Sequence, residues 1–288
     1  MSFRSSRYGG RRARLGDPVA HIASRLGPRG RCLFMPNGGN LGDALIAAAT
    51  IQQFRRAGIP WCLIRGQRHT VTSNDVLVFG GGGSLVSLYD GGVACVASLL
   101  QLCAPVVVLP QTVNGHAHFW SSVSGVTVFC RDTESLTHLQ QFAGVRPAFA
   151  DDMAFGLDLS VAPFAEACVR RTGKGHASVL GTLLAFRGDA ESACAVPDGN
   201  CDVSVLRQPS LSSPESIESD AAEFVGAIAG HSGIRTDRLH VAIVGALLGI
   251  PTLLHDNAYG KNRAVFEASM RGRFPHVQFA KCPAPQKS

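Results

Sequence analysis

The sequence predicts an α/β protein with parallel sheets, arranged as two similar halves that face each other across a cleft. Short apolar runs alternate along the chain with helical patterns, which is typical of strand–helix–strand units in a parallel sheet. Glycine is abundant, with 32 of 288 residues, and aromatic residues are few. This composition favours tight strand-to-helix turns over an all-β sandwich, and the length allows one large domain or two modest ones.

Apolar runs and helical periodicity place the elements of the first half, which we expect over residues 29–160. Strands are predicted at 32–35, 61–64, 76–79, 106–109 and 126–129. A helix is predicted over 43–56, because Ala44, Ala48 and Ile51 recur at the spacing of one helical face. Two more helices are expected near 89–102 and 132–142.

The second half is expected over residues 161–288, after the pattern breaks around 150–175. Strands are predicted at 179–186, 204–206 and 251–254, and helices near 214–229, 236–248 and 261–270. The apolar run at 241–254 has 14 residues and is interrupted by Gly249 and Pro251, so it is too short and too broken to span a bilayer.

Positive charge is concentrated at the N-terminus. Residues 1–31 hold eight arginines and one acid, a net charge of +7, whereas the other 257 residues carry −1. We expect residues 1–28 to be a basic, disordered arm that is either solvated or attracted to an anionic membrane surface. Nucleic acid is not an expected partner, because the rest of the chain shows no basic stripe and no base-stacking aromatic residues.

The nine cysteines are odd in number, form no C-x-x-C pair, and several lie in apolar runs. This usage is typical of a reducing compartment, so we expect a cytoplasmic protein with no disulfide and no zinc site. No apolar segment follows the N-terminal arginines, and a secretory signal is therefore not expected.

The glycine-rich segment NGGNLGDAL, residues 37–45, lies between a predicted strand and a predicted helix. Its glycines let a ligand approach the backbone, and the helix start offers free N–H groups. Asn40 and Asp43 are expected to contact a substrate hydroxyl. Alternatively, Gly38, Gly39 and Gly42 only make the turn and Asp43 caps the helix. The segment lacks the motifs of dinucleotide-binding and P-loop proteins.

Polar residues also follow later strands. Gln111 and His116 come after the strand at 106–109. The imidazole of His116 either reaches a substrate or is exposed. A metal is not expected at His116 and His118, since no third ligand has a recognisable spacing. Arg131 is either a cation of the cleft or a partner of Asp132. Arg187 ends the strand at 179–186, where a cation suits an anionic ligand, unless it only pairs with Asp189.

The hexapeptide RTDRLH, residues 235–240, stands directly before a long apolar run. Charges at the edge of a core are costly unless they are paired, hydrated or used. If Thr236 or Asp237 caps the helix, Arg238 and His240 lie in its first turn and can converge on an anion above the helix end. Alternatively, Asp237 is only a cap and the arginines are solvated.

Seven segments together resemble one family. NGGNLGDALI, VFGGGGSL, LPQT, RDTES, ADDMAF, TDRLHVAIVGALLGIP and HDNAYGKNRAVFE occur in the order and roughly the spacing of the polysaccharide pyruvyl transferases, over about residues 30–270. The resemblance implies two Rossmann-like domains in the arrangement of the GT-B glycosyltransferases. It also implies transfer of pyruvate from phosphoenolpyruvate to a sugar of a surface polysaccharide or its lipid-linked precursor. The products would be a pyruvate ketal and phosphate, and no metal or other cofactor would be needed.

The resemblance also assigns a donor side to the second half. Arg238, Leu239 and His240 match the R-L-H donor-binding motif of the family, and Arg187 resembles its further donor-contacting arginine. Phosphoenolpyruvate carries a carboxylate and a phosphate, and the planar fork of arginine suits both groups. Lys261 could neutralise further charge. His240 would be the general acid or a phosphate ligand.

By the same resemblance, the first half faces the acceptor. The Asn40–Asp43 loop would bind the sugar, with Gln111 and His116 as further contacts, and Asp43 is a candidate base for the sugar hydroxyls. Two other functions stay open from the sequence. One is a glycosyltransferase of the same fold with a nucleotide-sugar donor, and the other is a non-catalytic assembly protein that docks on the inner face of the membrane through the basic arm.

Overall fold

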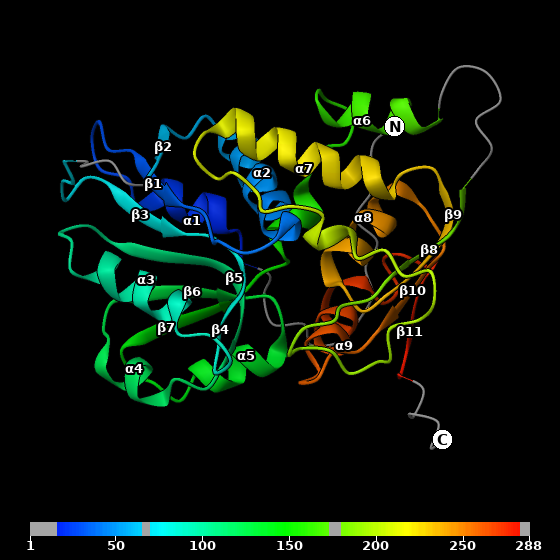
Figure 1. The fold of residues 1–288 in the computed structure, drawn as a ribbon. Coiled ribbons are helices and arrows are strands. Elements are labelled where there is room, and N and C mark those ends of the chain that lie inside the picture. The colour runs from blue at the N-terminus through cyan, green and yellow to red at the C-terminus, as the bar shows by residue number, and fades with distance from the viewer. Residues whose placement is uncertain (1–15, 65–69, 173–179, 283–288) are drawn as a thin grey trace.

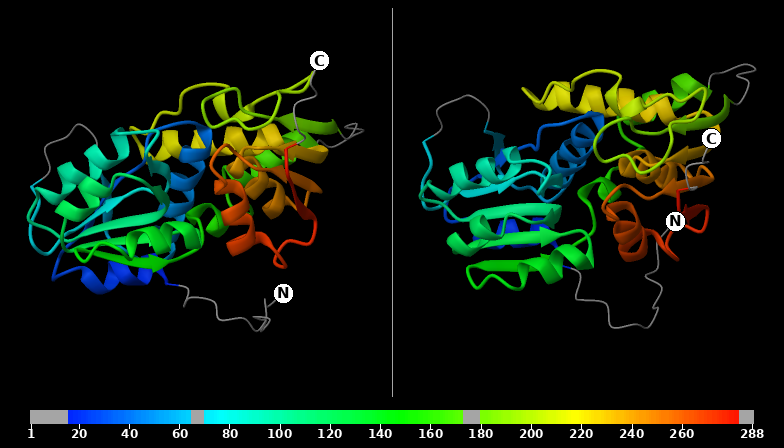
Figure 2. Two further views of the ribbon diagram at one scale, coloured as in Figure 1. Left: turned by 90° about the horizontal axis from the view of Figure 1, so that it is seen from below. Right: turned by 60° about the horizontal axis from the view of Figure 1, so that its bottom comes forward.

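The computed structural model describes residues 16–64, 70–172 and 180–282. In this part of the chain the strands form two sheets, and every strand pair in both is parallel. The predicted α/β class with parallel sheets is confirmed. Figures 1 and 2 show the sheets side by side, with helices packed around both.

The first sheet holds the strands up to residue 149, in the order β2-β1-β3-β5-β6-β7, with β4 paired to β5. Its strands are β1 (Cys32–Met35), β2 (Trp61–Leu63), β3 (Val76–Phe79), β4 (Gly82–Val86), β5 (Val106–Asn114), β6 (Val126–Cys130) and β7 (Val145–Phe149). The VLVF of β3 is buried on both faces, as expected for a central parallel strand covered by helices on each side.

The second sheet has the order β11-β10-β9-β8. Its strands are β8 (Leu180–Ala185), β9 (His231–Thr236), β10 (Thr252–His255) and β11 (Val277–Ala280). All strands of the first sheet lie within 29–160 and those of the second within 161–288. The boundary between two domains at residue 160 stays a prediction.

Helices connect the strands and cover the sheets. They are α1 (Pro18–Arg25), α2 (Leu41–Arg56), α3 (Gly91–Leu100), α4 (Ala117–Ser122), α5 (Thr133–Leu139), α6 (Phe164–Thr172), α7 (Pro214–Ile228), α8 (Leu239–Leu248) and α9 (Lys261–Val265). Shorter turns are η1 (Met153–Gly156), η2 (Val203–Val205) and the π-helical η3 (Phe266–Met270). None of the described helices is both long and apolar enough to cross a lipid bilayer.

One apolar core joins the two halves. Helix α7 packs against α2, so a helix of the second half covers a helix of the first (Figure 1). Buried Phe54 of α2, Phe224 of α7 and Val241 of α8 belong to the same hydrophobic cluster. The opposite face of the first sheet has a separate cluster around Trp120. This shared core fixes the position of the carboxyl end of β1 relative to that of β9. The polar residues described below follow these two strand ends.

Two sequence-based expectations about local structure are wrong. Residues 18–25, expected in a disordered arm, form α1, because Asp17 caps the helix through the backbone N–H groups of Val19 and Ala20 while Ile22 is fully buried. The remaining residues 1–15 of that arm lie outside the described residues. The run at 204–206, expected as a strand, belongs to the helical turn η2.

The start of the helix predicted over 236–248 also differs. Strand β9 extends to Thr236, so the helix α8 begins only at Leu239, with Arg238 as the N-cap residue. Asp237 is therefore not the cap; its carboxylate accepts a hydrogen bond of 2.8 Å from the backbone N–H of Arg187. Thr236 Oγ1 accepts from the Arg238 N–H at 2.9 Å.

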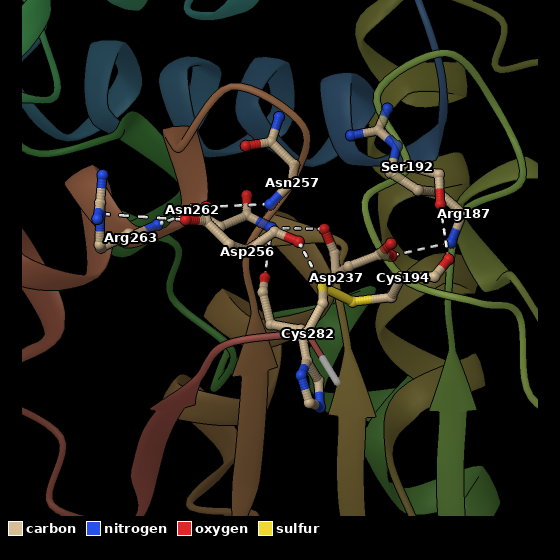
Figure 3. The surroundings of a disulfide bond; sticks show 10 residues. Arg187, Ser192, Cys194, Asp237, Asp256, Asn257, Asn262, Arg263 and Cys282 are labelled. Atoms are coloured by element: carbon tan, nitrogen blue, oxygen red, sulfur yellow. Dashed lines mark hydrogen bonds and ion pairs between the residues drawn. A yellow bond between two sulfur atoms is a disulfide. The ribbon is translucent and has the colours of Figure 1, made fainter. Parts of the chain in front are cut away.

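The expected absence of disulfides is wrong as well. Cys194 and Cys282 are bonded, with Cα atoms 5.2 Å apart, although 88 positions separate them in the sequence. The bond joins the segment after β8 to the segment after β11 (Figure 3). The two sulfur atoms and a ring nitrogen of buried His255 lie within 4.8 Å of one another. Because the sulfurs are bonded to each other, neither is the thiolate that a metal ion requires.

Candidate active site

A cavity of about 690 Å³ lies between the two sheets and is lined by residues from both. Strand β4 and the segments that follow β1, β4 and β6 line it on one side, and segments that follow β8, β9 and β10 line it on the other. Ligands of α/β proteins commonly bind outside the carboxyl ends of parallel strands, and a cavity of this size suits a small substrate.

Two arginines of the second half stand on one wall of the cavity. Arg187 follows β8 and Arg238 follows β9, and their side chains are only 6% and 7% exposed. The Nε of Arg238 lies 3.1 Å from both carboxylate oxygens of Asp202. Asp189 bridges the arginines, with its Oδ1 2.7 Å from Arg187 Nε and its Oδ2 3.2 Å from Arg238 Nη1.

Asp189 differs from the arginines because its side chain is 44% exposed. The Asp189 carboxylate thus lies between the buried guanidinium groups of Arg187 and Arg238, on the side that is open to the cavity. Asp189 is therefore the partner of these arginines that is accessible from the cavity.

Glu191 is the most connected carboxylate of the cavity. It is 6% exposed, and its oxygens accept hydrogen bonds from Arg187 Nη1 at 2.5 Å, Lys261 Nζ at 2.7 Å, Tyr89 Oη at 2.8 Å and Tyr259 Oη at 3.1 Å. Burial alone would raise the pKa of Glu191, but the charges of Lys261 and Arg187 outweigh it and hold the pKa well below its usual range. Tyr89 belongs to the first half, so this carboxylate joins both sides of the cavity.

Lys261 is the first residue of α9 and is 9% exposed. Burial lowers the pKa of Lys261 to about 8; Glu191 opposes this shift, and the nearby charges of Arg131 and Arg187 add to it. The lysine is therefore a cation at neutral pH that loses its charge more readily than an exposed lysine. It lies near Gly83 of the first half, where an added Cβ would be 3.8 Å from Nζ.

His240 lies in the first turn of α8, where its ring contacts the first half. Its Nε2 is 3.5 Å from Oδ2 of Asp152, and Nη1 of Arg131 is 2.6 Å from the same oxygen. His240, Arg131 and Leu239 all line the cavity, whereas Asp152 lies behind them. Arg131 therefore is a cation of the cleft, as one of the two alternatives had it, but its ion-pair partner is Asp152. Asp132 instead caps α5.

Asn40 and Asp43 begin α2 on the opposite wall. Asn40 is the N-cap residue and accepts from the Gly42 N–H at 2.8 Å, and Asp43 accepts from the Asn40 N–H at 2.8 Å. Both residues form a capping box and also line the cavity. Burial raises the pKa of Asp43, and the nearby His240 offsets only part of this effect.

Gln111 and His116, expected at the acceptor site, do not line the cavity. Strand β5 runs to Asn114, beyond its predicted end, so Gln111 lies inside the sheet, fully buried, and donates to the Gly80 carbonyl at 2.7 Å. His116 precedes α4, and its Nε2 is 3.0 Å from the Val86 carbonyl and 3.1 Å from that of Tyr89. These contacts tie His116 to the loop between β4 and α3.

A family model for polysaccharide pyruvyl transferases matches residues 40–258. The chain belongs to this family. A crystal structure of a functionally uncharacterized protein from Klebsiella pneumoniae subsp. pneumoniae NTUH-K2044 is similar to this chain, with a TM-score of 0.77 and 25% sequence identity. The similarity covers 91% of this chain and 96% of that chain. Among the curated proteins no match was found.

The cavity also holds Glu191, a residue that the sequence did not single out. Glu191 follows β8 by only a few positions, which is the signal that could have found it. Its partners cannot be read from the sequence, because Glu191 contacts side chains from both halves. Asp152 lies in the ADDMAF segment, and its position beside His240 depends on the packing of α8 against η1.

Proposed function

We propose that this pyruvyl transferase moves pyruvate from phosphoenolpyruvate to a sugar of a surface polysaccharide or its lipid-linked precursor, forming a ketal and releasing phosphate. One observation carries the proposal: Arg131, Arg187, Arg238 and Lys261 converge on a single cavity. Phosphoenolpyruvate has a carboxylate and a phosphate, and several cations are needed to bind both. The family match supports the same reaction class.

The proposed reaction requires proton transfers and charge stabilisation. Protonation of the methylene carbon makes C2 an electrophile, and one sugar hydroxyl adds to it. The bond from C2 to the phosphate oxygen then breaks, and the second hydroxyl closes the ketal. One of the two hydroxyl protons balances the proton given to the methylene carbon, and the other leaves with phosphate. We assign the exchange of these protons to His240 and Asp43, which both line the cavity, and the stabilisation of the departing phosphate to the cations.

We assign the donor to the wall formed by Arg187 and Arg238, and the acceptor to the wall formed by Asn40 and Asp43. Each wall follows the strand ends of a different sheet, which supports two Rossmann-like domains in a GT-B-like arrangement. The donor would replace Asp189 on the two arginines. The acceptor would be presented at the cytoplasmic face of the membrane, and a membrane contact by the basic arm concerns residues outside the described ones.

The donor identity can be tested by thermal unfolding with phosphoenolpyruvate and, separately, with nucleotide sugars. A ligand that binds only the folded state at 100 times its Kd stabilises the protein by about 2.7 kcal/mol. We expect stabilisation by phosphoenolpyruvate that Arg238→Ala removes and Arg235→Ala retains, since Arg235 is exposed and does not line the cavity. Stabilisation by a nucleotide sugar and not by phosphoenolpyruvate would instead support a glycosyltransferase.

A further inference from the structure

Asp152 is a fully buried carboxylate behind the wall of the cavity. Its side chain is 0% exposed, and its Oδ1 accepts a hydrogen bond of 2.9 Å from the Ala154 N–H at the start of η1. Its Oδ2 faces two side chains that do line the cavity, Arg131 at 2.6 Å and His240 at 3.5 Å. A buried charge of this kind is costly unless its partners compensate it.

Arg131 keeps this carboxylate ionised. The Arg131 side chain is 1% exposed, with Nη1 on Asp152 and Nε donating to Thr112 Oγ1 at 3.0 Å. Burial alone would raise the pKa of Asp152, but the contact with His240 and the charge of Arg131 outweigh burial and hold the pKa well below its usual value. An ionised carboxylate only accepts hydrogen bonds, so the nitrogen of His240 that faces it must carry the proton.

The two nitrogens of His240 face different surroundings. Nε2 is buried and faces Asp152, and at 3.5 Å the contact is longer than a full hydrogen bond. Such contacts commonly shorten when a substrate binds. Nδ1 lies on the other side of the ring, beside Gly42 at the start of α2, where an added Cβ would be 2.5 Å away. Asn40 and Asp43, which flank Gly42, line the cavity.

We infer that Asp152 is a positioning residue for His240: it fixes the neutral ring with the proton on Nε2 and presents the lone pair of Nδ1 to the acceptor side of the cavity. This inference rests on the proposed function and adds a role to it. When a sugar hydroxyl attacks C2, its O–H bond breaks, the proton passes to Nδ1 and the oxygen bonds to carbon. The positive charge that forms on the ring then faces the Asp152 carboxylate.

Asp152 comes from the first half and His240 from the second. The pair forms only when α8 packs against η1, so the base is assembled across the two walls of the cavity. Asp43 on α2 and Arg131 after β6 are the other charged groups close to this ring. The charge of Lys261 also acts to lower the pKa of Asp43. Arg131 thus has two functions, because it pairs with Asp152 and also contributes charge to the cavity.

Asp152→Asn tests the inference, because asparagine keeps the shape and removes the charge. We expect kcat to fall by about 100-fold or more, within the range for loss of general base catalysis. The KM for phosphoenolpyruvate should change much less than kcat, because Asp152 does not line the cavity and Arg131 keeps its charge and its hydrogen bond to Thr112. Asp151→Asn is the matched control, because the neighbouring Asp151 pairs with Arg273 and Ser269 instead. In a His240→Gln background Asp152→Asn should cause no further loss. A wild-type kcat in Asp152→Asn, or an undiminished second loss in the double variant, would overturn the inference.

A spectroscopic measurement on the wild-type protein gives a second readout that does not depend on turnover or on the folding of Asp152→Asn. The nitrogen-15 shifts of His240, assigned by the signal missing in His240→Gln, report which ring nitrogen carries the proton. We expect the proton on Nε2, and a neutral ring protonated on Nδ1 would refute the role of Asp152. If the proton is on Nε2 but phosphoenolpyruvate is never consumed, the proposed function fails while the placement of the ring is supported.

Discussion

Replacement of Glu191 by glutamine tests whether the carboxylate compensates the two cations that face it. Glutamine has nearly the same shape but no charge, and its amide can accept only part of the hydrogen bonds that Glu191 now accepts. Arg187 and Lys261 would then lose their common anionic partner. Because Asp189 still pairs with Arg187, Lys261 should lose more of its charge compensation than Arg187 does.

The magnitude follows from burial. Glu191, Arg187 and Lys261 have side chains that are 6%, 6% and 9% exposed, so solvent screens their interaction little. Breaking a buried ion pair by removing one partner costs about 3–5 kcal/mol. With an unfolding entropy of about 2.1 cal/mol/K per residue and 288 residues, this loss lowers Tm by about 5–8 °C.

The assay is thermal and denaturant unfolding at pH 7 with and without phosphoenolpyruvate. We expect Glu191→Gln to lose about 3–5 kcal/mol and to gain more from saturating phosphoenolpyruvate than the wild type does, because the donor supplies the missing negative charge. Glu267→Gln is the matched control: Glu267 forms an exposed pair with Arg271, which is worth about 0–1 kcal/mol. A loss in Glu191→Gln no larger than in this control would refute the reasoning.

Three further predictions concern single side chains. In Gly42→Ala the new Cβ would lie 2.5 Å from Nδ1 of His240 and would displace the ring. Since a misplacement of about 1 Å can cost about 100-fold in rate, kcat should fall by about that factor. An unchanged kcat would contradict a catalytic role of His240. Because the pKa of Lys261 is about 8, its charge is lost as pH rises, so the KM for phosphoenolpyruvate should increase above that pH in the wild type and stay flatter in Lys261→Arg. The unfolded lysine, with its pKa of 10.5, binds more protons between pH 8 and 10.5, so this group makes stability rise with pH over that window. Cys194→Ser should lose about 2–4 kcal/mol of stability in the absence of reductant, whereas Cys201→Ser, outside the disulfide, should not.

Apolar runs made much of the fold predictable. The strands at 32–35 and 76–79 and the helix that ends at Arg56 agree closely with the structure, because each is a short apolar run or a clear helical periodicity. Strand β9 was missed, since Ile234 is its one large apolar residue, and β-pairing with β8 and β10 supplies what the local sequence lacks. That error also displaced the predicted start of α8.

Residues that line the cavity were predictable where they directly follow a strand or begin a helix, as with Asp43, Arg187 and Arg238. Gln111 failed this rule, because β5 continues past the apolar run and buries the side chain. Contacts between distant segments could not be predicted. The Asp152–His240 pair and the Cys194–Cys282 bond both depend on tertiary packing, which no spacing in the sequence encodes.

Phosphate release tests most directly whether phosphoenolpyruvate is the donor and a sugar diol the acceptor. It is measured with phosphoenolpyruvate against a panel of lipid-linked and synthetic glycosides, and the product is examined for a pyruvate ketal. We expect release that depends on one acceptor class and is lost in Arg238→Ala and His240→Ala. Full pyruvyl transfer by either variant would contradict it, as would consumption of a nucleotide sugar with no release of phosphate from phosphoenolpyruvate.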